Sequence, residues 1–270
     1  MPELPEVETT LRGIAPHVLD KTINKVVIRH YGLRWPIVRD IHKKLMGHQV
    51  VQLARRGKYL LLHLTQGTLI IHLGMSGRLG IFDKNTPAQK HDHVDVEFNE
   101  QKILRFTDPR RFGAFLWTED PDSHKLLNHL GPEPLTEEFS AQYLYNRSRN
   151  KKLPVKTFIM DQKIVVGVGN IYANEALFLA GINPNQSAGQ ISLFSYKKLT
   201  QHIKNILKQA IKQGGTTLKD FLNSDGKPGY FSQSLHVYGR EHQPCTRCNT
   251  VLVAIQIGKR QTVFCPKCQL

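Results

Sequence analysis

The chain has few cysteines and uses all of them at one end. Four cysteines occur in 270 residues, as Cys245-x2-Cys248 and Cys265-x2-Cys268, with 16 residues between the two pairs. The body of the chain can therefore hold neither a thiol nucleophile nor a disulfide. The sequence also lacks a long apolar run, and its start has no basic or apolar targeting stretch. We expect no membrane association and a cytoplasmic location.

Two common enzyme motifs are missing as well. Each Gly-Lys pair, at Gly57, Gly226 and Gly258, is followed by Tyr, Pro or Arg, so none forms the Ser/Thr-terminated loop that cradles a nucleotide triphosphate. We expect no nucleotide cofactor. The chain has no His-Glu-x-x-His pair, and His91-Asp92-His93 lacks a third ligand, which indicates local hydrogen bonding in a turn.

Acidic residues are scarce in the C-terminal half. Residues 139–270 contain 18 basic and 5 acidic side chains, a net of +13, whereas residues 1–138 carry a net of only +2. A concentrated basic surface binds the phosphate backbone through counterion release, so we predict a nucleic-acid partner. An anionic membrane is the rival partner. It is disfavoured because the basic residues are dispersed among predicted helices and turns.

The cysteine spacing itself is typical of a four-cysteine zinc ribbon. Two Cys-x-x-Cys turns bring four thiolates to one tetrahedral ion, and so small a segment needs the metal to fold. We predict one structural Zn2+ on Cys245, Cys248, Cys265 and Cys268. A pair of disulfides or a redox motif is the alternative, but no targeting stretch is present and neither pair opens a βαβ pattern. Residues 258–260 (Gly-Lys-Arg) lie midway between the pairs, where a hairpin would turn and present a cationic tip.

Short apolar segments dominate residues 22–117 and predict strands. Turn residues separate them and helical periodicity is nearly absent, so we predict a β-sandwich or flattened barrel. A single helix precedes it; Pro5 lies in the first turn of this helix, and one face of the helix is apolar. The composition of residues 130–135 is typical of a linker. Beyond the linker we predict helices, the clearest over 195–213 with Gly214-Gly215 as its stop. The predicted strands are 50–53, 59–64, 68–73, 78–82, 94–98, 103–106 and 114–117.

The N-terminus offers unusual chemistry. Pro2 is small enough for Met1 to be removed, and the exposed secondary amine, with a pKa of about 7.7–8.0, is a ready nucleophile. Attack on an aldehydic sugar carbon would give a cationic iminium that acidifies the adjacent carbon. Glu3 could donate a proton to the sugar ring oxygen, and Glu6 could orient or charge-balance the site. Spacing alone favours a simpler interpretation, in which both carboxylates and the proline cap a helix.

Five motifs spread over the whole chain carry a family resemblance. They are Met1-Pro-Glu-Leu-Pro-Glu-Val-Glu-Thr9, Arg56-Gly-Lys-Tyr59, Asp108-Pro-Arg-Arg-Phe-Gly113, Gly167-Val-Gly-Asn-Ile-Tyr-Ala-Asn-Glu175 and the closing ribbon. With these motifs the sequence resembles the formamidopyrimidine-DNA glycosylases, bifunctional enzymes that repair oxidised purines. This implies an α+β multidomain fold: an N-terminal β-sandwich with a leading helix (1–130), a helical helix-two-turns-helix domain (131–234) and the zinc ribbon (235–270).

The resemblance also implies roles for individual residues. Pro2 would be the Schiff-base nucleophile, Glu3 the general acid and Glu6 a supporting carboxylate, with Lys58 and Arg260 completing the catalytic set. Each DNA-contacting position has an ordinary structural counterpart, such as a strand-face histidine, a helix N-cap asparagine or a core phenylalanine. The implied DNA contacts are the phosphate clamps His72, Asn170, Tyr238 and Arg260; the wedge Met75, Arg110 and Phe112, which fills the gap left by a flipped nucleotide; the lesion-side residues Lys156, Glu175 and the loop 216–230; and His91.

The implied function is excision of 8-oxoguanine and formamidopyrimidines from double-stranded DNA by a monomer, followed by β,δ-elimination at the abasic site. Two alternatives stay open. An oxidised-pyrimidine glycosylase of the endonuclease VIII type shares the Pro-Glu start, although Leu4 and Pro5-Glu6-Val7 fit the purine branch better. A non-catalytic DNA-binding protein on the same scaffold would have an inert N-terminus.

Overall fold

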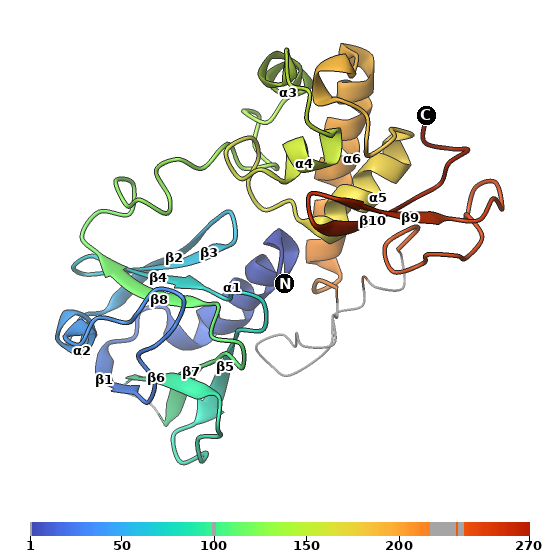
Figure 1. Ribbon diagram of the computed structural model, residues 1–270. Coiled ribbons are helices and arrows are strands. Elements are labelled where there is room, and N and C mark those ends of the chain that lie inside the picture. Colours follow the sequence, from blue (N-terminus) through green and yellow to red (C-terminus); the bar gives the residue numbers. More distant parts are fainter. Residues whose placement is uncertain (1, 99–100, 217–230, 232–234) are drawn as a thin grey trace. The chain divides into compact units, whose positions relative to one another are not determined.

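The chain folds into two compact units in the computed structural model, which describes residues 2–98, 101–216, 231 and 235–270 (Figure 1). Unit 1 comprises residues 1–129 and 213–230, and unit 2 comprises residues 130–212 and 231–270. Apart from Thr216, the loop 216–230 that we predicted to lie beside the lesion falls outside the described residues. The division into three domains stays a prediction.

Unit 1 is the predicted β-sandwich. Two four-stranded antiparallel sheets share one core, to which both contribute fully buried side chains such as Leu62, Ile71 and Leu104. One sheet has the order β1-β6-β7-β5 and consists of β1 (Ile23–Ile28), β6 (Asp92–Phe98), β7 (Lys102–Thr107) and β5 (Arg78–Asp83). The other has the order β2-β3-β4-β8 and consists of β2 (Val50–Arg56), β3 (Tyr59–Leu64), β4 (Thr68–His72) and β8 (Ala114–Thr118).

Two elements of unit 1 were not predicted. Strand β1 lies at a sheet edge and fully buries only its first residue, Ile23, so the strict alternation of a half-buried strand is missing. Helix α2 (Ile41–Leu45) is only 5 residues long, which is too short for helical periodicity to show. The seven predicted strands all form, with ends that differ by no more than a few residues.

Helix α1 (Leu4–Val18) carries the N-terminal motif. Its apolar face buries Leu4, Val7, Ile14 and Val18, and the helix contacts strands of both sheets. Pro5 lies in the first turn, where a missing N–H costs nothing, and Glu3 is the N-cap. The start of α1 is therefore fixed against the sandwich core, and Pro2 and Glu3 are fixed with it.

Unit 2 contains the predicted helices. They are α3 (Ala141–Ser148), α4 (Val155–Met160), α5 (Asn170–Ala180) and α6 (Leu193–Lys212), with a short 3-10 turn η1 (Ala188–Gln190). The buried helix α5 packs on α4, α6 and the ribbon. It ends at Gly181, whose φ of 71° is the left-handed conformation that glycine adopts at a helix C-terminus.

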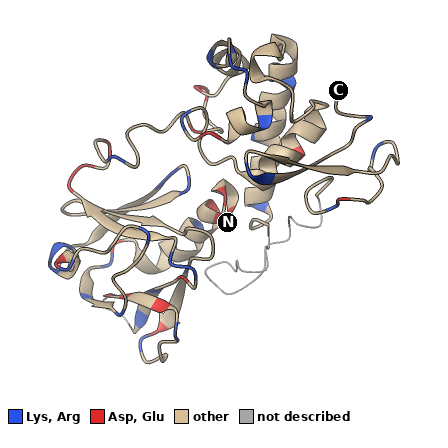
Figure 2. Ribbon diagram, viewed as in Figure 1, with Lys and Arg blue, Asp and Glu red and all other residues tan. Residues whose placement is uncertain are grey.

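A β-hairpin of β9 (Val253–Ile257) and β10 (Arg260–Phe264) completes unit 2. Gly258 and Lys259 form its two-residue turn, and both have a positive φ, 55° and 59°, as a type I′ hairpin turn requires. The predicted cationic tip is thus formed, with Arg260 exposed next to the turn. Basic side chains outnumber acidic ones along this unit (Figure 2). None of the described helices is long and apolar enough to cross a membrane.

Candidate active site and metal centre

The start of α1 gathers Pro2, Glu3 and Glu6 in a buried corner of unit 1. Pro2 is buried, Glu3 is 2% exposed and Glu6 is 0% exposed. Both Glu6 oxygens are bound: Oε2 accepts the Glu3 backbone N–H and Oε1 accepts the Thr216 backbone N–H, each at 2.8 Å. Glu3 and Glu6 form a capping box at the start of α1. This geometry is compatible with both interpretations, helix capping and catalysis.

Gly215 explains how Thr216 reaches this corner. Its φ is +84°, and a Cβ there would lie 3.1 Å from Glu6 Oε1 and 3.3 Å from Glu6 Cγ. Only glycine combines this conformation with so close an approach. The segment that follows α6 is therefore pressed onto the Glu6 carboxylate, which serves as its anchor.

The β2–β3 turn presents Lys58. Gly57 has a φ of 58°, and Lys58 is only 7% exposed. Arg55 ties this turn to α1, because its Nε donates to Glu8 Oε2 at 2.9 Å and its Nη1 donates to the Gly57 carbonyl at 2.9 Å. Burial alone would raise the pKa of Glu8, but its bonds to Arg55 and Arg12 lower it, so the tie is between full charges.

His72 lies opposite Tyr59 on the neighbouring strand β3, with ring centroids 4.8 Å apart. Burial, and then the positive charges of Lys58 and Arg34, lower its pKa to about 4. The ring is therefore neutral at physiological pH. Its Nδ1 accepts the Gly74 backbone N–H at 3.0 Å, which leaves the proton on Nε2. His72 can serve a phosphate as a neutral hydrogen-bond donor, whereas Lys58 supplies charge.

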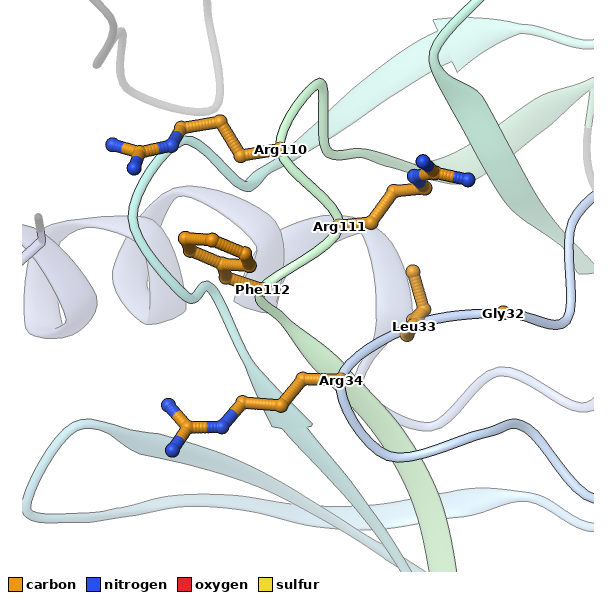
Figure 3. A pocket seen from close by; sticks show the side chains of 6 residues that line it. All are labelled: Gly32, Leu33, Arg34, Arg110, Arg111 and Phe112. Carbon is orange, nitrogen blue, oxygen red and sulfur yellow. The ribbon is translucent and has the colours of Figure 1, made fainter.

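Two loops bring the wedge residues together. Met75 follows β4, Arg110 and Phe112 precede β8, and the Arg110 guanidinium lies 4.9 Å from the centre of the Phe112 ring. Phe112 is 42% exposed, so it does not belong to the core. A hollow of about 510 Å3 beside it is lined by Gly32, Leu33, Arg34, Arg110, Arg111 and Phe112 (Figure 3).

Sequence reasoning missed Arg34. Figure 3 shows its side chain extending to the same side as Arg110 and Phe112, with Phe112 between the two arginines. Its positive charge helps to lower the pKa of His72, and it opposes the rise that burial causes in the pKa of Tyr59. Its signal in the sequence is the pair Arg34-Trp35, a cation next to an aromatic ring in an otherwise apolar segment, and the guanidinium stacks on that ring at 4.7 Å.

His91 lines a separate hollow of about 380 Å3 in unit 1. Arg29, Lys90 and Arg111 contribute positive charge to its wall, which His30, His93 and Asp92 also line. A cationic hollow of this kind suits a DNA phosphate, and the contact itself stays a prediction.

In unit 2, Lys156 and Asn170 meet at the first residues of β10. Lys156 is 1% exposed, and its Nζ donates to the Gln261 carbonyl at 3.0 Å and to Thr262 Oγ1 at 2.7 Å. Asn170 is the first residue of α5 after the N-cap Gly169, and its Nδ2 donates to the same carbonyl at 3.1 Å. Both residues thereby hold the strand that begins with Arg260.

Glu175 lies under the turn that contains Tyr238. It is 0% exposed, and its carboxylate accepts three backbone N–H groups at 2.8 Å: His236 on Oε2, and Val237 and Tyr238 on Oε1. Such a carboxylate is saturated with donors from its own protein. Its predicted contact with the lesion side stays a prediction, and what the geometry shows is that Glu175 orders Tyr238.

The four cysteines form the metal centre. Their Sγ atoms all lie within 4.8 Å of one another, and three pairs are 3.4, 3.5 and 4.0 Å apart. Ligands about 2.3 Å from a tetrahedral Zn2+ are about 3.8 Å apart, so the thiols fit the ion. The backbone N–H groups of Arg247 and Cys268 each point at a cysteine Sγ at 3.4 Å. All four are free cysteines, which leaves no disulfide here.

Three family models match the chain. They are the formamidopyrimidine-DNA glycosylase N-terminal domain over residues 1–115, the formamidopyrimidine-DNA glycosylase H2TH domain over 130–222, and the zinc finger found in FPG and IleRS over 243–270. Among curated proteins, the formamidopyrimidine-DNA glycosylases of Pseudomonas savastanoi and Acidithiobacillus ferrooxidans are 57% and 55% identical over 269 residues, with 100% of each chain covered.

Solved structures agree. The MutM (FPG) protein of Thermus thermophilus is 36% identical with a TM-score of 0.89, covering 99% of this chain and 98% of that one. A Lactococcus lactis FPG mutant in complex with Fapy-dG-containing DNA is 32% identical with a TM-score of 0.91, covering 99% of both chains. Fold, zinc ribbon and full-length similarity lead to one conclusion. The chain belongs to the formamidopyrimidine-DNA glycosylase family of DNA-repair enzymes.

Proposed function

We propose that the protein excises 8-oxoguanine and formamidopyrimidines from double-stranded DNA and then cuts the strand at the abasic site by β,δ-elimination. The observation that carries the proposal is the corner at the start of α1. There Pro2 and two carboxylates, 2% and 0% exposed, lie side by side in a protein of this family. Buried carboxylates next to a nucleophilic nitrogen suit proton transfer to a bound sugar.

In the proposed mechanism the Pro2 amine, freed by removal of Met1, attacks C1′ of the damaged nucleotide. The bond from C1′ to the base breaks, and the departing base takes up the proton that the amine nitrogen loses. Glu3 gives its proton to the ring oxygen, so the sugar opens and the C1′–nitrogen adduct becomes an iminium. Loss of a C2′ proton expels the 3′ phosphate, and a second elimination expels the 5′ phosphate. Glu6, held by two backbone N–H groups, fixes the positions of Glu3 and of residue 216.

Unit 2 would hold the DNA backbone. The N-terminus of α5, the Tyr238 turn and the exposed Arg260 supply donors and charge suited to phosphates, and unit 1 contributes His72 and Lys58. The zinc, when bound, fixes the geometry of the ribbon and takes no part in the chemistry. Because the curated relatives are bacterial and the substrate is DNA, we place the activity in the bacterial cytosol or nucleoid.

Borohydride trapping tests the proposal directly. With an 8-oxoguanine duplex, reduction of the iminium should give a covalent complex, and mass spectrometry should place the adduct on the N-terminal peptide. Glu3→Gln should retain lesion binding and lose base excision by about 100-fold or more, because an amide cannot deliver the proton. An adduct on Lys58 or Lys156 would overturn the assignment of Pro2, and normal excision by Glu3→Gln would leave Glu3 as a helix cap.

Oxidised pyrimidines are a second substrate class to test. A wild-type Lactococcus lactis FPG, 32% identical to this chain, has been crystallised with oxidised-pyrimidine-containing DNA. The same nucleophile would act on either base, since the chemistry takes place at the sugar. Parallel trapping with an oxidised-pyrimidine duplex, at matched concentrations, would rank the two classes by the rate of adduct formation.

A further inference from the structure

The wedge residues come from two loops that are more than 30 positions apart in the sequence, and a hydrogen-bond hub joins these loops. Ser76, next to Met75, donates from Oγ to Asp108 Oδ1 at 2.8 Å and accepts the Arg110 backbone N–H at 3.1 Å. A single hydroxyl thus connects the loop that carries Met75 to the loop that carries Arg110 and Phe112.

Asp108 lies at the centre of this hub. It is 0% exposed, and its second oxygen, Oδ2, accepts the Gly113 backbone N–H at 2.8 Å. Its own N–H donates to the His91 carbonyl at 3.0 Å, and its carbonyl accepts His93 Nε2 at 2.7 Å. Side chain and backbone together fix both ends of the segment 108–113, within which Phe112 is exposed.

The two loops also touch at van der Waals distance. A Cβ on Gly74 would lie 2.5 Å from the Phe112 carbonyl carbon, and a Cβ on Gly113 would lie 2.7 Å from the His72 carbonyl oxygen and 3.0 Å from Asp108 Oδ2. Arg111, within the same segment, has a φ of 59°, which costs energy for a residue with a side chain. The segment therefore keeps an unfavourable conformation that its bonds must stabilise.

We propose that Ser76 and Asp108 are positioning residues for base extrusion: they lock Met75, Arg110 and Phe112 into one rigid wedge. The inference rests on the proposed function, because it assigns a task to a wedge that acts on duplex DNA. An aromatic side chain that enters a base stack works against the stacking energy of a few kcal/mol per step. A mobile loop would move away from the base stack and the base would stay in place. Phe112 can therefore displace a base only if buried contacts hold its loop rigid.

The clamp is tested by Ser76→Ala, which removes one hydroxyl and little volume. Two substrates are compared under single turnover: a duplex with 8-oxoguanine and a duplex with a preformed abasic site. We expect excision of 8-oxoguanine to slow about tenfold, the factor for roughly 1.4 kcal/mol from a lost buried hydrogen bond, and abasic-site cleavage to change less than about twofold. The fluorescence of a 2-aminopurine placed beside the lesion reports unstacking, and its rise should slow by the same factor. Ser123→Ala, an exposed serine of unit 1, is the matched control and should match wild type.

A double-mutant cycle separates positioning from general stability. If Ser76 acts through the wedge, adding Ser76→Ala to Phe112→Ala should cost less than about twofold, because the ring that it positions is gone. Asp108 provides a second variant. Asp108→Asn keeps the shape and one acceptor, so it should retain more excision than Asp108→Ala.

The inference would be overturned by equal rate losses of Ser76→Ala on both substrates, or by a full additional loss when Ser76→Ala is added to Phe112→Ala. Failure of the proposed function looks different, since wild-type protein would then neither excise 8-oxoguanine nor form a borohydride adduct. Wild-type activity with a loss in Phe112→Ala and none in Ser76→Ala would reject the clamp alone.

Discussion

Replacing Glu175 by Gln should loosen the Tyr238 turn while leaving unit 1 unchanged. The carboxylate accepts three backbone N–H groups, and glutamine has the same shape but only one acceptor oxygen. That oxygen can keep the Val237 and Tyr238 bonds. The amide nitrogen then faces the His236 N–H, so two donors oppose each other in a site that is 0% exposed.

The cost follows from these contacts. A hydrogen bond to a charged group contributes about 1.5–3 kcal/mol, and a buried donor without a partner costs a further ~1–3 kcal/mol. Because the two retained bonds also lose their charge assistance, we expect the free energy of unfolding of unit 2 to fall by about 3 kcal/mol. Tyr238 is also a proposed phosphate contact. We therefore expect the Kd for DNA with an abasic-site analogue to rise about tenfold. The number of phosphate contacts inferred from the salt dependence of Kd should fall by about one.

The structure allows the two units to be followed separately. Both tryptophans, Trp35 and Trp117, lie in unit 1, so fluorescence excited selectively from tryptophan reports the urea unfolding of unit 1. Zinc release into a chromogenic chelator reports unit 2. Glu137→Gln removes an exposed carboxylate of unit 2 and is the control for the change in charge. The reasoning is refuted if Glu175→Gln releases zinc at the wild-type urea concentration, or if it lowers the fluorescence midpoint as much as the zinc midpoint.

Two further predictions concern His72 and the metal. The folded protein lowers the pKa of His72 from 6.5 to about 4, so the unfolded chain binds an extra proton between these values and stability should fall as the pH drops from 6.5 to 4. In His72→Gln the free energy of unfolding should fall by about 2 kcal/mol less over this pH range than in wild type, a figure already discounted for partial exposure. Urea titrations at both pH values measure the difference. An identical loss of stability in the two proteins would contradict the assignment. Zinc removal by a chelator should abolish DNA binding without shifting the fluorescence midpoint of unit 1, and Arg260→Ala with zinc retained should reproduce most of that loss. Normal lesion binding by protein shown to be metal-free would contradict the coupling.

The elements with strong local patterns were predictable from the sequence. Seven strands of the sandwich, the long helix α6 with its glycine stop and the cysteine ribbon each carry a signal within a few residues. Strand β1 carries little, because an edge strand with a single fully buried residue lacks alternation. Its place in the sheet comes from pairing with β6, which is remote in sequence.

The candidate site divides in the same way. Pro2, Glu3 and Glu6 are neighbours on one helix turn, so their proximity could be predicted. The tertiary hydrogen bonds of the candidate site could not be predicted: Thr216 on Glu6, Ser76 on Asp108 and the Tyr238 turn on Glu175 join segments that are 32 to 210 positions apart. Such contacts are tertiary, and a single sequence without periodicity at these positions does not reveal them. The exposure of Phe112 also depends on tertiary packing, so the sequence did not reveal it either.

The bond between Glu6 and Thr216 also bears on how the protein is made. Unit 1 is discontinuous, so the ribosome must synthesise about 200 residues, at roughly 5–20 residues per second, before the N-terminal corner receives its last anchor. During those seconds the Glu6 carboxylate lacks one of its two backbone donors, although the Glu3 N–H can already bind its other oxygen. The corner that holds Pro2 and Glu3 is therefore completed late in synthesis, well after all the strands of the sandwich have been made.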